Sequence, residues 1–354
     1  MKALVYTANE EVSYRDEADP SPAPGEALVR IDAVGICGSD MHAYLGHDSR
    51  RVPPLILGHE AAGTVIAGTR PGQRVILNPL IACGTCNACL GGRSNLCAER
   101  DLIGMYRPGA FAERITITES NLIDIPDGMD PTHAALTEPA ATALHAVNLA
   151  ARSAWRPLSE ARALVIGGGS VGLFAALVLR DRGCRHVTLA ETNAHRRVTA
   201  QTAAIGEIID PIATPPAQST FELVIDAVGS GATRSAASAS VCPGGTIVHI
   251  GLMDNQPGFD VRYATLQEVT FIGTYTYTPV DLRITIAKLH AGDLGPLDWI
   301  EQRPLMEGAA AFDDLLHART AAPKIVLRPE SLGHAFSIIV GPMATAAFRR
   351  LWHT

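Results

Sequence analysis

The sequence predicts an α/β protein of two domains, one rich in β-strands and one built on a doubly wound parallel sheet. The chain has 354 residues, which suggests two domains because one domain averages about 150 residues. Residues 1–140 contain short strand-like segments separated by Gly and Pro, whereas strand-like and helix-like segments alternate through residues 141–272. A glycine-rich turn follows the first strand of this alternating region, as in nucleotide-binding α/β domains.

The N-terminal region predicts a β-rich domain of short strands. Apolar or alternating segments occur at residues 2–6, 27–37, 58–68, 71–77, 111–117 and 121–126. Proline and glycine separate them, as in PSPAPGE at residues 20–26. The alternation of strands and helices ends near residue 272, so we expect residues 273–330 to return to the first domain. Residues 331–354 form a C-terminal extension for which the sequence predicts no role.

The alternating region carries a dinucleotide-binding fingerprint. The apolar strand ALVI precedes Gly167, Gly169 and Gly172, which fit the pattern G-x-G-x-x-G. A helical segment begins at once, and the next strand, HVTLA, leads to Glu191, 19 residues after Gly172. The fingerprint requires this order of strand, glycine turn, helix, strand and acid. The region is therefore predicted to be a Rossmann domain that binds a pyrophosphate at the N-terminus of its first helix.

We predict that this domain binds NAD in preference to NADP. The predicted cofactor contacts are Gly167, Gly169, Ser170, Val171, Gly172, Glu191 and Arg196. The carboxylate of Glu191 would accept hydrogen bonds from ribose hydroxyls and repel the 2′-phosphate of NADP. Arg196 and Arg197 lie close enough in sequence to weaken this preference, and a solvated acid at a strand end is the alternative for Glu191.

Four of the seven cysteines lie within fifteen residues, in CGTCNACLGGRSNLC. Cys83, Cys86, Cys89 and Cys97 have the close spacing of metal ligands, and clustered cysteines in a reducing cytosol more often bind metal than form disulfides. Four thiolates complete a tetrahedral zinc site and leave no position for a substrate, so we expect a structural zinc. A reactive dithiol and an iron–sulfur cluster are the alternatives.

Composition and charge exclude several classes of function. The net charge of −7 gives no indication of a nucleic-acid or anionic membrane surface. The sequence has no stretch of about 18 uninterrupted apolar residues that would span a membrane. Its N-terminus, MKALVYTANE, lacks the apolar run of a signal peptide. These features predict a cytoplasmic protein with a small-molecule substrate and no nucleic-acid or membrane partner.

Three short fragments supply chemically active side chains: CGSDMH at 37–42, GHE at 58–60 and TEPAA at 137–141. Cys37, His59 and one glutamate would bind a zinc ion and leave one coordination position open. Such a zinc ion makes a bound alcohol acidic near neutral pH, and the alcohol can then release a hydride to a nicotinamide.

In this order, and together with the cysteine cluster and the fingerprint, the fragments resemble the zinc-dependent medium-chain alcohol and polyol dehydrogenases across residues 1–328. The resemblance implies a GroES-like catalytic domain formed by both chain ends, with the Rossmann domain inserted between them. It also implies two zinc ions per chain and a homo-oligomer, with a tetramer favoured over a dimer.

The resemblance assigns roles to individual residues. Cys37 and His59 match the first two ligands of the catalytic zinc. Glu138 matches the third ligand of the polyol and threonine dehydrogenases, where ethanol-type enzymes usually have cysteine. Glu60 matches a residue beside the metal that binds it transiently. The alternatives are a free thiol for Cys37, a core histidine for His59 and a helix N-terminal acid for Glu138.

Ser39 and His42 match the proton relay of the family, and Asp40 resembles an acid that orients the zinc-bound histidine. The alternatives are a helix cap for Ser39, a surface position for His42 and an acid in the first helical turn for Asp40. The segment GTYTYT has Thr276 where sorbitol-type enzymes have arginine, which argues against sorbitol as the substrate. Tyr44, Tyr106, Phe111 and Tyr277 are candidates for the pocket walls, although each also fits an ordinary packing role.

The predicted function is the reversible oxidation of a secondary alcohol or polyol by NAD. A threonine-type dehydrogenase acting on an amino alcohol is the alternative within the same class. A non-catalytic redox sensor that binds zinc and a nucleotide is the alternative from a different class.

Overall fold

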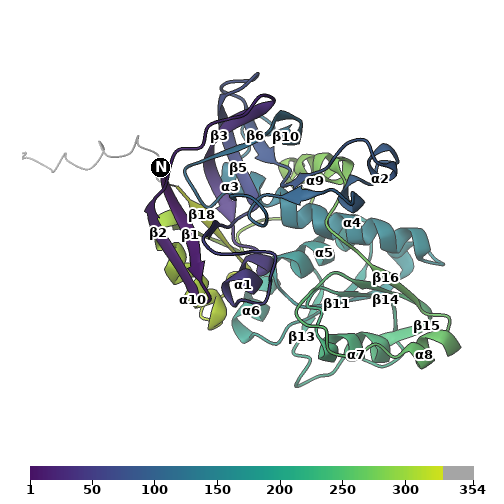
Figure 1. Cartoon of the computed structure of the whole chain (residues 1–354). Helices are drawn as coiled ribbons and strands as arrows, with labels where there is room; N and C mark the ends of the chain where they lie inside the picture. The colour runs from purple at the N-terminus through teal and green to yellow at the C-terminus, as the bar shows by residue number, and fades with distance from the viewer. Residues whose placement is uncertain (330–354) are drawn as a thin grey trace, which may run out of the picture.

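The computed structural model describes residues 1–329, which form two lobes connected by a long central helix (Figure 1). The C-terminal extension predicted from residue 331 onward lies outside the described residues. No helix within residues 1–329 is both long and apolar enough to cross a membrane.

A seven-stranded sheet forms the centre of the first lobe. Its strand order is β10-β6-β5-β3-β18-β17, and β9 also pairs with β3. These strands are β3 (Glu26–Gly35), β5 (Glu60–Ala67), β6 (Arg74–Leu77), β9 (Arg114–Thr118), β10 (Leu122–Asp124), β17 (Ile300–Pro304) and β18 (Lys324–Arg328). Apolar side chains alternate along β3 and β9, so one face of the sheet packs into the core.

Smaller elements complete this lobe. Two further sheets contain β1 (Lys2–Ala8), β2 (Glu11–Asp16) and β4 (Leu55–Ile56), and β7 (Leu80–Ile81) with β8 (Asp101–Leu102). The helices are α1 (Gly38–Tyr44), α2 (Asn87–Leu90), α3 (Pro131–Ala135) and α10 (Gly308–Leu316). Short 3-10 turns lie at Ser94–Leu96, Glu119–Asn121, Leu158–Glu160 and Leu305–Glu307.

The second lobe is a six-stranded parallel sheet with the order β13-β12-β11-β14-β15-β16. Its strands are β11 (Arg162–Ile166), β12 (His186–Ala190), β13 (Glu207–Ile209), β14 (Phe221–Asp226), β15 (Val241–His249) and β16 (Thr270–Gly273). The connecting helices are α5 (Ser170–Asp181), α6 (Ala194–Thr202), α7 (Gly231–Ser240) and α8 (Val261–Leu266). The strand order reverses between β11 and β14, which is where such sheets bind ligands. The prediction of a doubly wound parallel sheet is confirmed.

Helices α4 (Thr137–Ser153) and α9 (Pro279–Ala291) pack between the lobes. Many of the buried side chains of α4 are alanine, which adds little to the radius of the helix, so α4 packs closely against α5. The domain boundary that we predicted between residues 140 and 141 falls inside α4, which runs without interruption through both positions.

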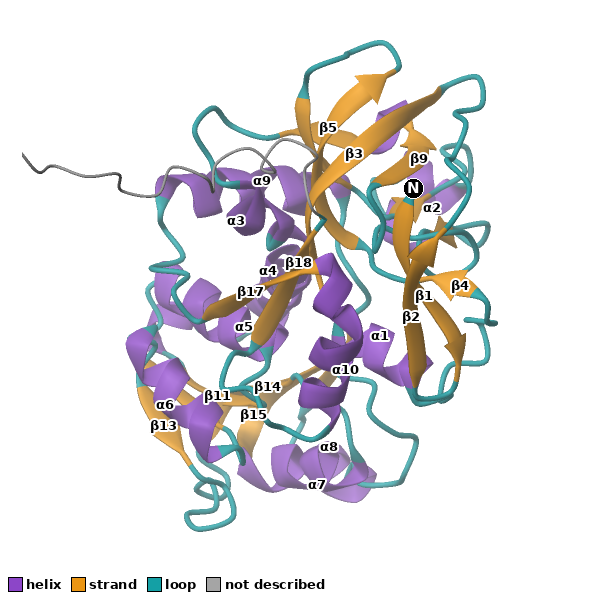
Figure 2. Ribbon diagram, turned by 90° about the vertical axis from the view of Figure 1, so that its left-hand side faces the viewer, coloured by secondary structure: helices purple, strands orange, loops and turns teal. Residues whose placement is uncertain are grey.

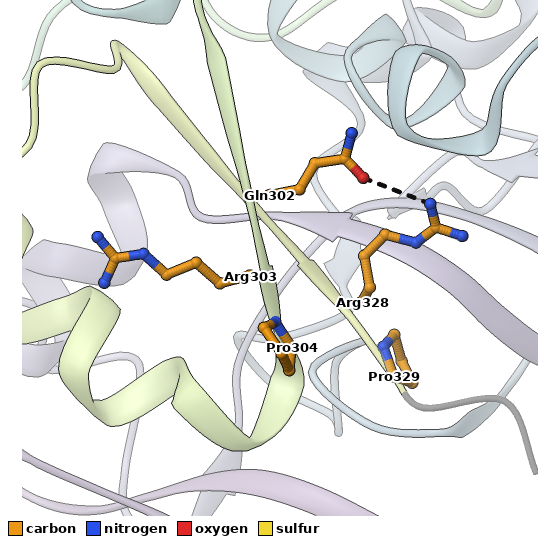
Figure 3. Close-up of a pocket in the computed structure, with 5 residues that line it drawn as sticks. All are labelled: Gln302, Arg303, Pro304, Arg328 and Pro329. Carbon is orange, nitrogen blue, oxygen red and sulfur yellow. Dashed lines mark hydrogen bonds between the residues drawn. The ribbon is translucent and has the colours of Figure 1, made fainter. Parts of the chain in front are cut away.

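Strands β17 and β18 show that the end of the described chain returns to the first lobe. They pair in parallel, and β18 lies antiparallel to β3, with Val326 opposite Gly35. Figure 2 shows both strands near the centre of the molecule, below β3 and β5. A shallow hollow lies beside the C-terminal parts of β17 and β18 (Figure 3). There Gln302 Oε1 accepts a hydrogen bond of 3.4 Å from Arg328 Nη1.

Candidate metal centres and nucleotide site

Strand pairing brings the scattered Cys, His and Glu side chains together. Cys37 follows β3 and caps α1, whereas His59 and Glu60 lie at the start of β5, the neighbour of β3. The pairing places Gly35 opposite Glu60, and a Cβ atom at Gly35 would lie 2.1 Å from Glu60 Oε2. The possible ligand atoms of Cys37, His59 and Glu60 all lie within 4.8 Å of one another. This spacing fits one ion with ligands at about 2.0–2.3 Å.

His59 is held between a carboxylate and a hydroxyl group. It is buried, with Nδ1 3.5 Å from Asp40 Oδ1 and Nε2 3.5 Å from Ser39 Oγ. Asp40 is fixed in turn by hydrogen bonds from the backbone N–H groups of Cys37 and Gly58. Burial lowers the pKa of His59, but the negative charges of Asp40 and Cys37 outweigh burial and raise this pKa well above its usual value. The site therefore attracts positive charge.

Glu60 forms a buried ion pair with Lys324. Lys324 Nζ lies 2.7 Å from both Oε1 and Oε2 of Glu60 and donates to the carbonyl oxygen of Ile36 at 2.7 Å. Both charged side chains are 1 % exposed. Burial lowers the pKa of Lys324, but the charge of Glu60 outweighs burial and raises it.

Glu138 lies in the first turn of α4, close enough for the charges of His59 and Glu60 to affect its pKa. Among the described residues, the ligand atoms at this centre that lie within 4.8 Å of one another belong to Cys37, His59 and Glu60, and Glu138 is not one of this group. Glu138 Oε1 accepts a hydrogen bond of 2.8 Å from the buried hydroxyl of Tyr277. Burial and the charge of Glu60 raise the pKa of Glu138 to about 7, although His59 opposes this shift. Within residues 1–329, its second oxygen, Oε2, has no hydrogen-bond partner, so it is free to bind a cation.

The two residues matched to the proton relay lie on α1. Ser39 Oγ accepts a hydrogen bond of 3.2 Å from Arg51 Nη2, besides its contact with His59. The N-cap of α1 is Cys37 rather than Ser39, so the alternative role of Ser39 as a helix cap is wrong. His42 is half-buried, and burial together with the nearby His47 lowers its pKa. A neutral imidazole near neutral pH can accept a proton.

The four clustered cysteines converge around one point. Their Sγ atoms all lie within 4.8 Å of one another, although the residues span the loop around α2. Backbone N–H groups of Thr85 and Cys86 point toward Cys83 and lower the pKa of its thiol to about 6. Their donor set is four sulfur atoms, which suits a tetrahedral zinc.

The glycine-rich turn has the shape that its sequence predicts. Gly167 adopts a φ of +100°, and a Cβ atom at Gly172 would lie 1.9 Å from the carbonyl oxygen of Gly167. Only glycine permits this close approach of β11 to α5. Gly167, Gly169, Ser170 and Val171 are partly exposed at the carboxyl edge of the sheet. The first N–H groups of α5 have no partner within the helix and can receive a phosphate.

Glu191 lies beside this turn at the end of β12. It is buried, with Oε2 accepting from the N–H of Gly168 at 2.7 Å and Oε1 accepting from the N–H of Asn193 at 2.6 Å. The solvated alternative for Glu191 is therefore wrong. The hydroxyl of Thr192 also donates to Oε1, at 3.4 Å. A carboxylate has about four acceptor positions, so one remains for a ribose hydroxyl. Arg196 is on α6, with a buried Nε atom that has no partner within the described residues.

The candidates for the pocket walls separate into two groups. Tyr44 and Phe111 belong to the core, where both rings pack against Phe312 at 5.2 and 6.0 Å between centroids. Tyr106 is exposed and lines a cavity, whereas Tyr277 is buried against Glu138. Thr276 has a φ of +49°, and its buried hydroxyl has no hydrogen-bond partner within residues 1–329.

Sequence reasoning did not predict two residues of this site and the role of a third. Lys324 and Arg51 are buried charges that contact Glu60 and Ser39. The hydroxyl of Tyr277 positions Glu138, a role that a wall residue would not have. One signal was present for Lys324, because a lysine beginning the apolar strand KIVLRP needs a buried partner.

Two family models match the chain. The model of the alcohol dehydrogenase GroES-like domain covers residues 23–127, and that of the zinc-binding dehydrogenases covers residues 170–291. The chain is 34 % identical over 295 residues to L-galactonate-5-dehydrogenase of Escherichia coli (strain K12), covering 79 % of this chain and 85 % of that protein. It is 30 % identical over 292 residues to L-threonine 3-dehydrogenase of Xanthomonas axonopodis pv. citri (strain 306), with coverages of 78 % and 84 %.

Solved structures show the same fold. Acetophenone reductase from Geotrichum candidum, in complex with NAD, has a TM-score of 0.83 and 26 % identity, over 92 % of this chain and 96 % of that one. A chain from Sinorhizobium meliloti 1021, described as a zinc-binding dehydrogenase and bound to NADP, has a TM-score of 0.82 and 28 % identity, with coverages of 93 % and 99 %.

This chain belongs to the zinc-binding medium-chain dehydrogenases, with a GroES-like domain followed by a Rossmann-like domain. It is an oxidoreductase of the class that oxidises alcohols with NAD or NADP. The predicted family, fold class and enzyme class are confirmed, and the non-catalytic sensor is excluded as the class of function.

Proposed function

We propose that the protein oxidises a secondary hydroxyl group of a polyol-type substrate with NAD. Cys37, His59 and Glu138 would hold a catalytic zinc, with Glu60 beside it. The four-cysteine cluster would hold a second, structural zinc. The observation that supports the proposal most is the convergence of the Cys37 thiol, the His59 imidazole and the Glu60 carboxylate beside Ser39, with the carboxylate of Glu138 close enough for its pKa to respond to His59 and Glu60. The zinc would supply a Lewis acid that makes the substrate hydroxyl more acidic.

The side chains of the protein support each part of this oxidation. Ser39 Oγ can accept the hydroxyl proton and pass it toward His42 and solvent, while the guanidinium of Arg51 fixes its position. NAD, held at the glycine turn beside Glu191, would supply the acceptor for the carbinol hydrogen, which leaves with the electron pair of its C–H bond as a hydride. The products are a ketone, NADH and one proton, and the reverse reaction reduces the ketone.

NAD is proposed over NADP because of the position of Glu191. Its carboxylate is buried against the glycine turn, where a 2′-phosphate would meet its negative charge. The proposal also keeps the homotetramer and the cytoplasmic location as predictions from the family resemblance.

The relatives suggest two classes of substrate. Some are named as dehydrogenases of sugar acids and others as L-threonine 3-dehydrogenases. Glu138 is common to both branches and does not separate them. We propose the polyol class first and the amino alcohol second, since the sugar-acid dehydrogenase of Escherichia coli has a higher identity to this chain than the L-threonine 3-dehydrogenase of Xanthomonas axonopodis pv. citri over a similar length. Direct comparison of substrates separates them.

NADH formation by the purified, zinc-loaded protein tests the proposal. The panel contains L-galactonate, neutral polyols, simple secondary alcohols and L-threonine, each with NAD and with NADP. Cys37→Ser and His59→Ala should abolish turnover while circular dichroism shows an intact fold. Cys242→Ser is the matched control, because Cys242 is a buried thiol outside both metal centres. Absence of turnover across the panel, with two zinc ions bound per chain, would contradict the proposed function.

A further inference from the structure

A polar cavity lies in the first lobe near the candidate catalytic centre. It has a volume of about 130 Å³, and its lining includes Arg50, Arg100, Met105, Tyr106 and Tyr275. About 10–15 Å³ of such space holds one water molecule, so the cavity has room for a carboxylate and a few hydroxylated carbons.

Three contacts place this cavity next to the catalytic centre. Arg51, which follows Arg50, donates a hydrogen bond to Ser39 Oγ at 3.2 Å. The turn at Gly104, just before Met105, packs on the backbone of Gly58, which precedes His59. These contacts connect the cavity to both the relay serine and the metal-binding histidine.

The third contact comes from the segment after β16. Tyr275 lines the cavity, and Tyr277, two residues later, donates to Glu138. The side chain of Asn95 donates to the carbonyl oxygen of Tyr275 at 2.9 Å and fixes this segment against the loop that carries the four clustered cysteines. Three segments that line the cavity thus continue, within one or two residues, into contacts with the catalytic centre.

The charge of the cavity suits an anion. Asp48 forms ion pairs with Arg50 and Arg51, at 2.8 and 2.5 Å. Arg100 stacks over the ring of Tyr275 at 4.8 Å and has no carboxylate within 4.0 Å among residues 1–329. The lining therefore has two guanidinium groups, of which only that of Arg50 is paired with a carboxylate, and this leaves one net positive charge.

The hydrogen-bonding capacity also fits an anion with hydroxyl groups. Within the described part of the chain, the hydroxyls of Tyr106 and Tyr275 have no hydrogen-bond partner. Arg100 uses Nη1 to bind the carbonyl oxygen of Cys97, and its other N–H donors are free. The lining contains no Asp or Glu side chain, so it offers no counter-charge for an ammonium group.

We propose that this cavity is a carboxylate subsite and that the substrate is a polyhydroxy acid. Its carboxylate would lie between Arg50 and Arg100, while a secondary hydroxyl further along its carbon chain reaches the catalytic centre. Arginine suits this role because its planar fork matches a carboxylate. The inference rests on the proposed function and specifies its substrate class. Threonine is disfavoured because the lining has no carboxylate to pair with its ammonium group.

Steady-state kinetics of the zinc-loaded protein test this inference. L-galactonate is compared with galactitol, in which an uncharged CH2OH group replaces the carboxylate. We expect kcat/KM for L-galactonate to exceed that for galactitol at least about tenfold, since a hydrogen bond to a charged group contributes that much or more. Arg100→Gln should raise KM for L-galactonate about tenfold to hundredfold, with a smaller change in kcat.

Two further variants control for indirect effects. Tyr275→Phe keeps the ring under Arg100 but removes the hydroxyl, so it should raise KM for L-galactonate even if Arg100→Gln folds poorly. Arg283→Gln is the matched control, because Arg283 is an exposed arginine on α9 away from the lining, and both substrates should keep their wild-type kinetics.

Isothermal titration calorimetry with L-galactonate distinguishes failure of the subsite from failure of the oxidation. If no alcohol is oxidised but L-galactonate binds and Arg100→Gln abolishes binding, the subsite stands and the proposed oxidation fails. If both substrates are oxidised equally well, or the preference survives in Arg100→Gln and Tyr275→Phe, the subsite is refuted and the oxidation stands. Absence of both turnover and binding refutes both.

Discussion

Replacing Lys324 with methionine should destabilise the protein strongly, because it leaves the buried carboxylate of Glu60 unpaired. Lys324 Nζ lies 2.7 Å from both carboxylate oxygens, and both side chains are 1 % exposed. Coulomb's law at this distance gives about 6 kcal/mol with an effective dielectric constant near 20. Breaking buried ion pairs in other proteins destabilises them by about 3–5 kcal/mol. We expect the free energy of unfolding to fall by an amount in this range, since the carbonyl oxygen of Ile36 also loses its hydrogen-bond donor.

Urea unfolding at a fixed zinc concentration measures this loss. The double variant Lys324→Met/Glu60→Gln should recover part of the stability, since the unpaired charge has then been removed. Lys2→Met is the control, because Lys2 pairs with Asp16 at the surface and its removal should leave the unfolding midpoint unchanged. A loss below about 1 kcal/mol for Lys324→Met, or no recovery in the double variant, would refute the reasoning.

Three further predictions follow from the metal, cofactor and helix contacts. Cys86→Ser should remove one zinc ion per chain and lower the thermal midpoint, because structural metal binding contributes to folding; metal analysis that still finds two ions would contradict the assignment. Glu191→Ala should raise kcat/KM with NADP relative to NAD, and an unchanged ratio would show that Glu191 does not select the cofactor. Asp281→Asn should lower the free energy of unfolding by about 2 kcal/mol at pH 7. Burial raises the pKa of Asp281, but hydrogen bonds from His145 and Thr278 outweigh burial and lower this pKa to about 2. Because the folded-state pKa is depressed, this contribution is present above pH 4 and is lost between about pH 4 and pH 2, so urea midpoints of variant and wild type should converge there.

Local signals in the sequence predicted much of the fold and part of the site. The glycine fingerprint predicted the turn between β11 and α5, because the backbone there requires glycine. The spacing of the four cysteines predicted that their sulfur atoms converge, which the loop around α2 achieves over a short distance. Such features depend on neighbours in the sequence, so they can be read without knowing the tertiary structure.

Contacts between segments distant in the sequence were harder to predict. Lys324 reaches Glu60 across 264 positions, and Tyr277 reaches Glu138 across 139. No local pattern specifies such partners, since they depend on the pairing of β18 with β3 and on the packing of α9 beside α4. The predicted boundary at residue 140 was placed by composition, whereas α4 continues through it because its helical hydrogen bonds do not depend on domain membership.

The return of β18 to the first lobe also constrains how the protein is made. A ribosome synthesises the strands around Cys37 and His59 long before it reaches Lys324, so β3 then lacks its neighbour β18. The parallel sheet is continuous in sequence from β11 to β16 and can fold as a unit while translation proceeds. We expect the nascent chain to acquire its nucleotide-binding half first and to expose an unpaired edge of β3 until the last strand arrives.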